Sequence, residues 1–364
     1  MLATYARSII GSMTEGTTQS TEQPAVSNRR LVELINGYQV SAAIGALARL
    51  GVADALANGP SSITELSRRL GADERALARL LDATLDIGLF TIGDDERYRL
   101  GELGDLLRSD VPGSLRRFAV VSTEHWRWAA YGHLTHTLRT GEPGFVGAHG
   151  CRLWDYLASH PEAAASFEES MARVGAARDR AVATAVDFST VDCLVDVGGG
   201  RGGLLCALLA VCPHLRGVVF DLPTVIGGTR EQLRQAGFAE RCEAIAGDFR
   251  EAVPPGGDAY LLSWILHDWD DATALRILGN CRAAMEEGSR LLVVEMVVPE
   301  PSQPNAAVFE RLVRQADLEM LAVVGGRERT AAEYEGLFTD SSFALSRILP
   351  LEGMPWSVIE GSAV

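Results

Sequence analysis

A glycine-rich run between residues 196 and 203 carries the clearest signal for chemistry in this chain. It reads Asp-Val-Gly-Gly-Gly-Arg-Gly-Gly and overlaps the end of the apolar run Cys193–Val197. Glycine lets a backbone turn tightly and approach a ligand closely, and the N-terminus of a following helix attracts anions. About 20 residues further on, Asp221 in the triplet Phe-Asp-Leu is an acid that fits recognition of ribose hydroxyls. The run therefore predicts a site for a nucleoside-containing cofactor.

The glycine spacing fits two cofactors. Gly198, Gly200 and Gly203 match the dinucleotide pattern G-x-G-x-x-G. Asp196 with Gly198, Gly200 and Gly202 matches D-x-G-x-G-x-G, the loop of S-adenosylmethionine (SAM) methyltransferases. An ordinary strand-to-helix turn is a third interpretation, which the acid downstream disfavours. The residues of this loop leave both cofactors open.

A histidine followed by acids, His267-Asp-Trp-Asp-Asp271, comes directly after the apolar run Ala259–Leu266. Ligands of open α/β sheets bind beyond the carboxyl ends of the strands, so this place favours a functional role over a capping or core histidine. Asp271 is expected to cap the helix that begins near residue 272. Glu295 lies in another apolar run, which predicts that it is buried beside a partner.

Positioning these residues requires a parallel sheet. Short β-rich runs alternate with helical stretches from Cys193 to Val298, which is typical of a doubly wound α/β domain. Two further runs, Ala344–Leu351 and Ser357–Val364, predict an antiparallel edge. We expect this Rossmann-like domain to span residues 186–364.

The N-terminal part has a different sequence pattern, with apolar residues at helical spacing. Residues 1–28 are expected to form a disordered leader, and residues 29–185 a mainly helical domain. Within it, Ser62 and Glu65 form a capping-box pattern, and Asp73 is expected to cap a helix from Glu74 to Ile87. The segment 89–100 then reads as a β-hairpin, so helix, turn, helix and hairpin predict a winged helix.

Composition excludes several classes of protein. The 364 residues carry a net charge of −15, which disfavours broad nucleic-acid binding. All 33 basic residues are Arg, so Schiff-base, P-loop and protein-kinase chemistry that requires Lys is excluded. The six cysteines form no Cys-x-x-Cys pair, and no apolar stretch is long enough to cross a membrane. We expect a cytoplasmic protein without a metal site.

Five motifs in order resemble one family. They are the glycine loop, Phe220-Asp-Leu-Pro, Gly247-Asp-Phe, the run from His267 to Asp271, and Gly325-Gly-Arg-Glu-Arg-Thr330. Over roughly residues 30–364 the chain resembles the class I SAM-dependent O-methyltransferases of the plant caffeate and bacterial polyketide type. The resemblance decides the cofactor in favour of SAM. It implies a homodimer joined through the winged-helix domain, and a small phenolic or polyketide-type acceptor from secondary metabolism such as antibiotic biosynthesis.

The resemblance also implies a role for each matching residue. Its cofactor-binding positions are Gly198, Gly200, Asp221, Leu222, Asp248, Phe249 and Ser263. His267 matches the catalytic base, and Glu295 and Glu328 match the acids that flank it. Its substrate-binding positions are Trp126, Phe167, Met171, Asp317 and Met320.

Proton transfer explains why such a base needs two acids. A phenol has a pKa near 10 and histidine one near 6.5, so full transfer between them costs about 5 kcal/mol. Carboxylates beside the imidazole stabilise its cationic form and close much of that gap.

Two other functions compete with O-methylation. The first is a SAM-binding homologue with other chemistry such as hydroxylation. The second is a winged-helix DNA-binding regulator, which the net charge of −3 over residues 29–110 disfavours.

Overall fold

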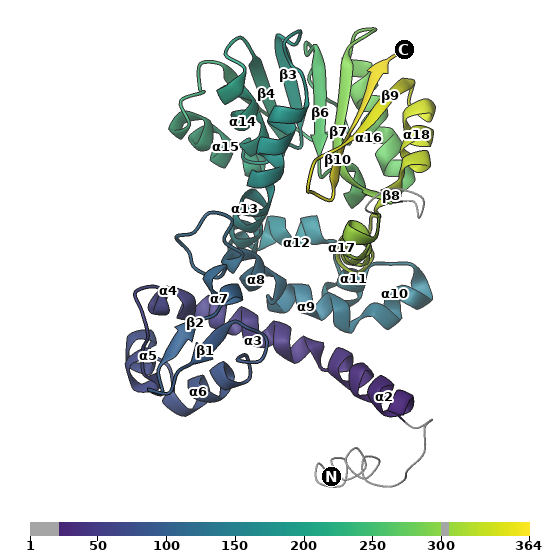
Figure 1. Cartoon of the computed structure of the whole chain (residues 1–364). Helices are drawn as coiled ribbons and strands as arrows, with labels where there is room; N and C mark the ends of the chain where they lie inside the picture. The colour runs from purple at the N-terminus through teal and green to yellow at the C-terminus, as the bar shows by residue number, and fades with distance from the viewer. Residues whose placement is uncertain (1–21, 300–305) are drawn as a thin grey trace. The chain divides into compact units, whose positions relative to one another are not determined.

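A mixed β-sheet forms the centre of the C-terminal part of the chain (Figure 1). Its main strands are β3 (Cys193–Val197), β4 (Arg216–Asp221), β5 (Cys242–Ala246), β6 (Ala259–Ser263), β7 (Arg290–Val298), β9 (Phe343–Pro350) and β10 (Trp356–Ala363). Their spatial order is β5-β4-β3-β6-β7-β10-β9, and the short β8 (Arg329–Thr330) pairs with β7. The first five of these strands are parallel, and β10 is antiparallel to β7 and β9. The sequence prediction of a parallel sheet with an antiparallel edge is confirmed.

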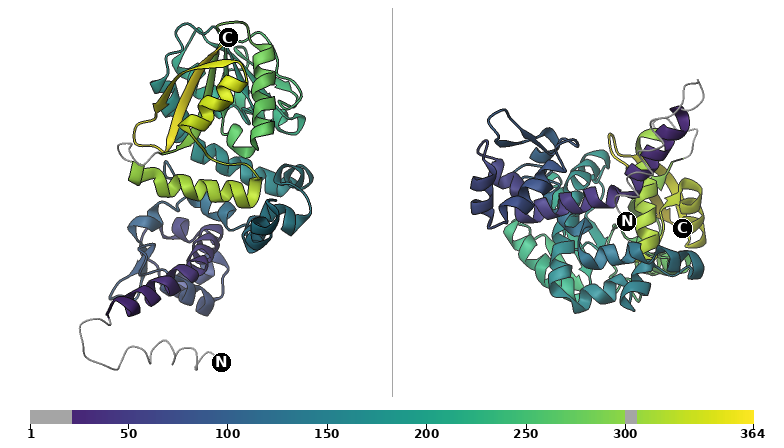
Figure 2. Two further views of the ribbon diagram at one scale, coloured as in Figure 1. Left: turned by 90° about the vertical axis from the view of Figure 1, so that its right-hand side faces the viewer. Right: turned by 90° about the horizontal axis from the view of Figure 1, so that it is seen from below.

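Side chains alternate between the two faces of the strands, and each face has its own apolar core. Leu194, Leu261 and Val294 point to the face covered by α14 (Gly203–Val211) and α15 (Pro223–Gln235). Val195 and Leu262 point to the opposite face, which α16 (Asp271–Ala284) and α18 (Ala331–Asp340) cover. The near-continuous apolar strands therefore follow from burial on both faces (Figures 1 and 2).

Helices surround this sheet and precede it. They are α9 (His125–Gly132), α10 (Leu134–Thr140), α11 (Gly144–His149), α12 (Leu153–Ser159), α13 (Pro161–Ala185), α14 (Gly203–Val211), α15 (Pro223–Gln235), α16 (Asp271–Ala284), α17 (Ala306–Glu319) and α18 (Ala331–Asp340). A 3₁₀ turn spans Leu266–Asp268, and a π-helical turn, Met320–Val324, follows α17. The turn at Leu266–Asp268 contains the histidine singled out by the sequence.

The N-terminal part of the chain is a separate helical unit. Its elements are α2 (Glu22–Ile35), α3 (Gly37–Leu50), α4 (Val52–Leu56), α5 (Ile63–Leu70), α6 (Glu74–Asp82), β1 (Phe90–Ile92), β2 (Tyr98–Leu100), α7 (Glu102–Asp105) and α8 (Arg116–Ser122). The predicted hairpin is confirmed, since β1 and β2 pair antiparallel. The capping box is confirmed as well, because the N–H of Glu65 donates to the Ser62 hydroxyl and that of Ser62 to the Glu65 carboxylate.

The computed structural model describes residues 22–299 and 306–364. It divides into units Met1–Thr123 and Glu124–Val364, whereas the sequence placed the boundary near residue 185. The difference arises because α13 packs against α14 and so belongs with the sheet. Most of the leader expected over residues 1–28 lies outside the described residues, and its last residues, from Glu22 onward, belong to α2.

Within the described residues, no single helix is both long and apolar enough to span a membrane. One bent pair of helices, Ser27–Ile35 with Gly37–Leu50, together has the length and apolar composition of a membrane span, and these two properties alone are weak evidence for one.

Candidate active site

The sheet register brings the candidate residues to one edge. Strands β3, β4, β6 and β7 are parallel neighbours, so the residues at their carboxyl ends lie side by side. Ser263 ends β6 opposite Val294 of β7, and Glu295 is the next residue of β7. The glycine loop begins at Gly198 directly after β3, and Asp221 ends β4.

A sharp turn after β6 positions the histidine. Trp264 has φ = 58°, a left-handed conformation that costs a residue with a β-carbon about 1–2 kcal/mol. Glu295, which is fully buried, holds the turn in place. Its Oε1 accepts N–H groups from Ile265 and Leu266, both at 2.9 Å.

Three carboxylates surround the imidazole of His267. Nδ1 lies 2.9 Å from Oε1 of Glu328 and 3.6 Å from Oε2 of Glu295, and Nε2 lies 3.4 Å from Oδ1 of Asp268. Burial alone would lower the pKa of His267. The charges of Glu295, Asp268 and Glu328 outweigh burial and raise this pKa to about 10. The imidazole is therefore cationic at neutral pH, and its pKa matches that of a phenol.

Asp268 is the acid that sequence reasoning did not assign to the site. Burial, together with the negative charges of Glu295 and Glu328, raises its pKa to about 7, although the neighbouring His267 opposes the rise. Its only sequence signal is adjacency to His267, which becomes contact because the 3₁₀ turn presents both side chains together. The cap expected at Asp271 lies one residue earlier, since Asp270 accepts the N–H of Thr273 at 2.8 Å.

The glycine motif at residues 325–330 fixes this turn from the other side. A β-carbon on Gly326 would overlap the carbonyl oxygen of His267, so only glycine allows this approach. The N–H of Arg327 donates to that same carbonyl at 2.8 Å. The fully buried Arg329 donates to the carbonyls of Leu266 and Trp269, at 2.7 and 2.8 Å. These bonds place Glu328 against the imidazole.

The glycine loop adopts the conformations that its sequence predicts. Gly198, Gly200 and Gly202 all have positive φ, which residues with a β-carbon rarely adopt. The carboxylate of Asp221 accepts the N–H groups of Gly200, at 2.8 Å, and Leu222, at 2.6 Å. A β-carbon on Gly200 would meet open space, so the loop leaves room for a ligand beside Asp221.

The other expected cofactor positions lie at neighbouring strand ends. Asp248 follows β5 and pairs with Arg250 at 2.6 Å, and this hydrogen bond lowers the pKa of the carboxyl. Phe249 contacts the ring of Trp269 edge to face, with 6.2 Å between centroids. The hydroxyl of Ser263 is buried and makes no hydrogen bond to any residue that the structure describes. A buried polar group without a partner fits a ligand that supplies one.

His267, Glu295 and Glu328 also meet the spacing of a metal-ligand set, since one atom from each lies within 4.8 Å of the others. Nδ1 of His267 pairs with Glu328, and Oε1 of Glu295 accepts two backbone N–H groups. The second oxygen of each glutamate, Oε2, is buried and has no hydrogen-bond partner among the described residues. The existing hydrogen bonds compete with metal binding, and the absence of a metal stays a prediction.

Comparison with known proteins identifies the family. The O-methyltransferase domain model matches residues 131–344, and the O-methyltransferase dimerisation domain model matches residues 32–110. The chain belongs to the SAM-dependent O-methyltransferases. It is 40% identical to the phenazine O-methyltransferase PhzM of Lysobacter antibioticus, over 88% of this chain and 92% of that protein.

Two solved structures support this assignment. The mitomycin 7-O-methyltransferase MmcR has a TM-score of 0.87 and 34% identity, over 95% of this chain and all of that one. The O-methyltransferase NcsB1 from neocarzinostatin biosynthesis, solved with SAM and 2-hydroxy-5-methyl naphthoic acid, has a TM-score of 0.78 and 32% identity. That match covers 89% of this chain and 96% of the other. The cofactor of the methyltransferase is therefore SAM, and the dinucleotide alternative is excluded.

The expected substrate-side residues of the methyltransferase come from three helices. Phe167 and Met171 lie one turn apart on α13 and are both half-buried. Met320 begins the π-helical turn after α17 and is buried. Asp317 of α17 accepts the N–H of Glu328 at 2.9 Å, so it also supports the cluster around His267.

Trp126 of α9 lies in an aromatic cluster. Its ring centroid is 6.2 Å from that of Phe145 and 6.3 Å from that of Tyr156. Trp126 is buried, which fits core packing, while its unpartnered Nε1 leaves a donor available. Its contact with the acceptor stays a prediction.

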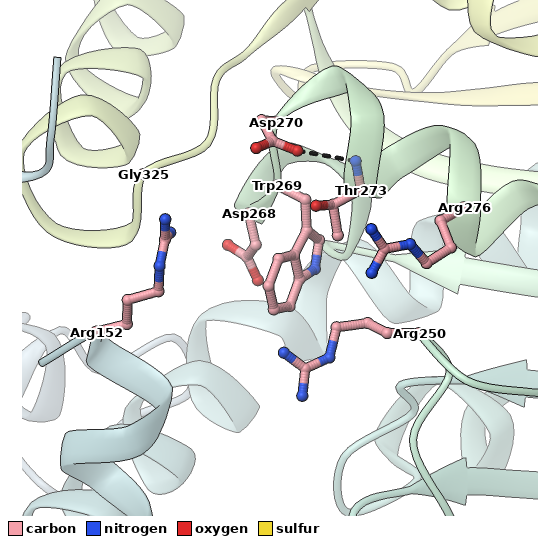
Figure 3. Close-up of a pocket in the computed structure, with 8 residues that line it drawn as sticks. All are labelled: Arg152, Arg250, Asp268, Trp269, Asp270, Thr273, Arg276 and Gly325. Carbon is pink, nitrogen blue, oxygen red and sulfur yellow. Dashed lines mark hydrogen bonds between the residues drawn. The ribbon is translucent and has the colours of Figure 1, made fainter.

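A pocket of about 220 Å³ lies beside the cluster around His267 (Figure 3). Arg152 and Gly325 form one side of it, Arg250 and Arg276 the other, with Asp268 and Trp269 between them. Asp268 therefore joins the cluster around His267 to this cavity.

Proposed function

We propose that this methyltransferase methylates a hydroxyl of a small aromatic acceptor, with His267 as the general base. The observation that carries the proposal is the buried imidazole between Glu295 and Glu328, with Asp268 beside Nε2. Nδ1 is engaged by Glu328, which leaves Nε2 as the nitrogen that can face an acceptor. Such an arrangement serves proton abstraction better than it serves cofactor binding.

The surrounding acids set the strength of the base. With a pKa of about 10, the neutral imidazole accepts a proton from a phenol of similar pKa at almost no cost. An ordinary histidine would require about 5 kcal/mol for the same step. Glu295 and Glu328 stabilise the imidazolium that forms, and Glu295 also holds the backbone of the turn.

SAM supplies an electrophilic methyl group on a sulfonium. In our proposal, the loop at Gly198 and Gly200 receives its methionine part, Asp221 the ribose hydroxyls, and Asp248 with Phe249 the adenine. The unpartnered hydroxyl of Ser263 fits a further polar contact. Leu222 at the start of α15 completes this cofactor set, and Phe167, Met171 and Met320 are proposed to pack against the acceptor.

We also propose a homodimer joined through the N-terminal unit. Leu31, Leu34, Ile35 and Tyr38 on α2 and α3 are 56–63% exposed, which is unusual for large apolar side chains so close together. The match of residues 32–110 to a dimerisation domain supports the same assembly.

A product screen tests the activity. The purified protein is incubated with SAM and each of a set of phenolic acids, naphthoates and anthracycline-like polyketides, and the products are analysed by mass spectrometry. We expect a gain of about 14 Da, one methylene, on at least one hydroxylated aromatic acceptor whose oxygen is methylated. A gain of about 16 Da instead would favour hydroxylation. Transfer to carbon or nitrogen alone would contradict the proposal.

A further inference from the structure

Arg178 is a buried cation that the proposed reaction does not yet use. It lies on α13 with 7% of its surface exposed. Its Nε and Nη2 donate to Oδ1 of Asp179, at 3.1 and 2.8 Å, while Nη1 is buried and has no hydrogen-bond partner within residues 22–299 and 306–364. A buried guanidinium with free donors is costly, so such a group is expected to meet an acceptor in the working protein.

The guanidinium is held at the edge of the sheet where the cofactor residues lie. It stacks on the ring of Trp264, 4.2 Å from the centroid, and Trp264 directly follows Ser263. Gly175, one turn earlier on α13, leaves space for it, since a β-carbon there would lie 2.9 Å from Nη2. Stacking, the ion pair and the glycine gap together fix the orientation of this side chain.

Two observations tie Arg178 to the glycine loop. Asp179 reaches the start of α14, where a β-carbon on Gly203 would lie 3.2 Å from its Oδ2. Arg178 also acts on Asp196 at the end of β3. Burial, and then Asp179 and Asp221, raise the pKa of Asp196 to about 7, while Arg178 opposes the rise. The free donor thus belongs to the region between the ends of β3 and β6.

We propose that Nη1 of Arg178, with the unpartnered hydroxyl of Ser263, forms a subsite for the α-carboxylate of the cofactor's amino-acid head. The carboxylate is the one anionic group of SAM, and both unpartnered groups are hydrogen-bond donors. This inference rests on SAM being the cofactor and is independent of His267 acting as the base. Arg178 is a binding residue here and takes no part in proton transfer.

Binding of two cofactor fragments tests the subsite without turnover. S-adenosylhomocysteine carries the amino-acid head, and 5′-methylthioadenosine lacks it. By calorimetry, Arg178→Gln should weaken binding of S-adenosylhomocysteine tenfold to a hundredfold, the range for a hydrogen bond to a charged group. Binding of 5′-methylthioadenosine should change less than about twofold, because the adenosine contacts remain. The exposed Arg180→Gln, two residues along α13, is the matched control and should leave both affinities unchanged.

A comparison of ligands on the unaltered protein keeps the test decisive if Arg178→Gln does not fold. The carboxyl methyl ester of S-adenosylhomocysteine should bind at least about tenfold more weakly than the free acid, because the ester carries no charge. Equal binding of acid and ester overturns the inference. So does an equal loss of both fragments in Arg178→Gln, which would make the residue purely structural. If the unaltered protein binds neither fragment, the cofactor assignment fails and the inference fails with it.

Discussion

Nδ1 of His267 and Oε1 of Glu328 lie 2.9 Å apart, in a site where both side chains are almost inaccessible to water. This bond orients the ring and, in the proposed mechanism, leaves Nε2 as the nitrogen that accepts the proton. Because Glu295 and Asp268 add their charges, the imidazole retains its proton well above neutral pH. The raised pKa of His267 thus depends on four residues together.

The pH profile should report this raised pKa. Below pH 10 most of the imidazole is protonated, and an imidazolium cannot accept a proton from the acceptor. The neutral fraction grows about tenfold per pH unit, so kcat/KM for a phenol of pKa near 10 should rise between pH 7 and 9. It should level off near pH 10. A plateau from pH 7 upward would contradict the raised pKa.

Glu328→Gln provides the matched variant for this profile. It removes one of the charges that raise the pKa of His267 while keeping an amide oxygen to accept from Nδ1. The rise in kcat/KM should therefore level off at a lower pH than in the unaltered protein. An unchanged profile would show that Glu328 does not set the pKa of His267.

Gly326→Ala should disturb the turn that carries the histidine. Its β-carbon would overlap the carbonyl of His267, so the segment around Glu328 must shift. We expect a loss of about 1–3 kcal/mol in the free energy of unfolding, together with a fall in kcat. The control is Gly336→Ala on α18, where a β-carbon meets nothing within 4 Å. Because alanine favours helices, that change should raise the thermal midpoint, and the opposite ranking would contradict the steric argument.

Much of the fold and the site followed from sequence because strand ends and glycines leave local signals. Parallel strands share an edge, so Gly198, Asp221 and Ser263 had to lie near one another once their strands were recognised. The position of His267 and Glu295 at the same edge was predicted in the same way, because each follows or interrupts an apolar run; their roles stay predictions. The capping patterns were equally local, depending on residues three apart in the chain.

Other features depend on packing between distant segments, which periodicity does not reveal. Arg178 meets Trp264 across 86 positions of the chain, and no local pattern marks either residue. The unit boundary was misplaced because α9 to α13 have the same helical spacing as the N-terminal helices, although they belong with the sheet. The helix expected to reach Ile87 ends at Asp82. Just beyond this end, the side-chain hydroxyl of Thr84 donates to the Leu81 carbonyl, a local bond that competes with continued helix formation.

Activity should survive removal of divalent metals. His267, Glu295 and Glu328 lie near enough together to hold an ion, and Oε2 of each glutamate has no hydrogen-bond partner among the described residues. Nδ1 of His267, however, is already paired with Glu328, and Oε1 of Glu295 already accepts a backbone N–H. Treatment with EDTA followed by desalting should leave kcat unchanged, and added Mg²⁺ should not raise it. Loss of activity with EDTA that Mg²⁺ restores would replace the base mechanism with a metal-dependent one.

Light scattering should give about 78 kDa, twice the chain mass of 39.0 kDa, for a dimer with two-fold symmetry. Charge placed within the exposed apolar residues of α2 should weaken the dimer, because it would be buried on association. Leu34→Arg is the variant, and Leu138→Arg on α10 is the control, since Leu138 is also exposed but lies in the other unit. A mass of about 39 kDa at micromolar concentration for the unaltered protein would refute the proposed homodimer.

His267→Ala tests the base directly. It should lower kcat 10²- to 10⁴-fold, the usual contribution of a general base, while binding of S-adenosylhomocysteine stays nearly unchanged. The separation is expected because the proposed cofactor contacts come from other residues, including Asp221 and Asp248. The loss should shrink for an acceptor with a pKa near 7, which is already ionised and needs no base. Glu295→Gln should be milder, since an amide oxygen still accepts the N–H groups of the turn. Full turnover of His267→Ala on a phenol of pKa near 10 would show that His267 is not the base, and an equal loss of cofactor affinity would make it a cofactor-binding residue.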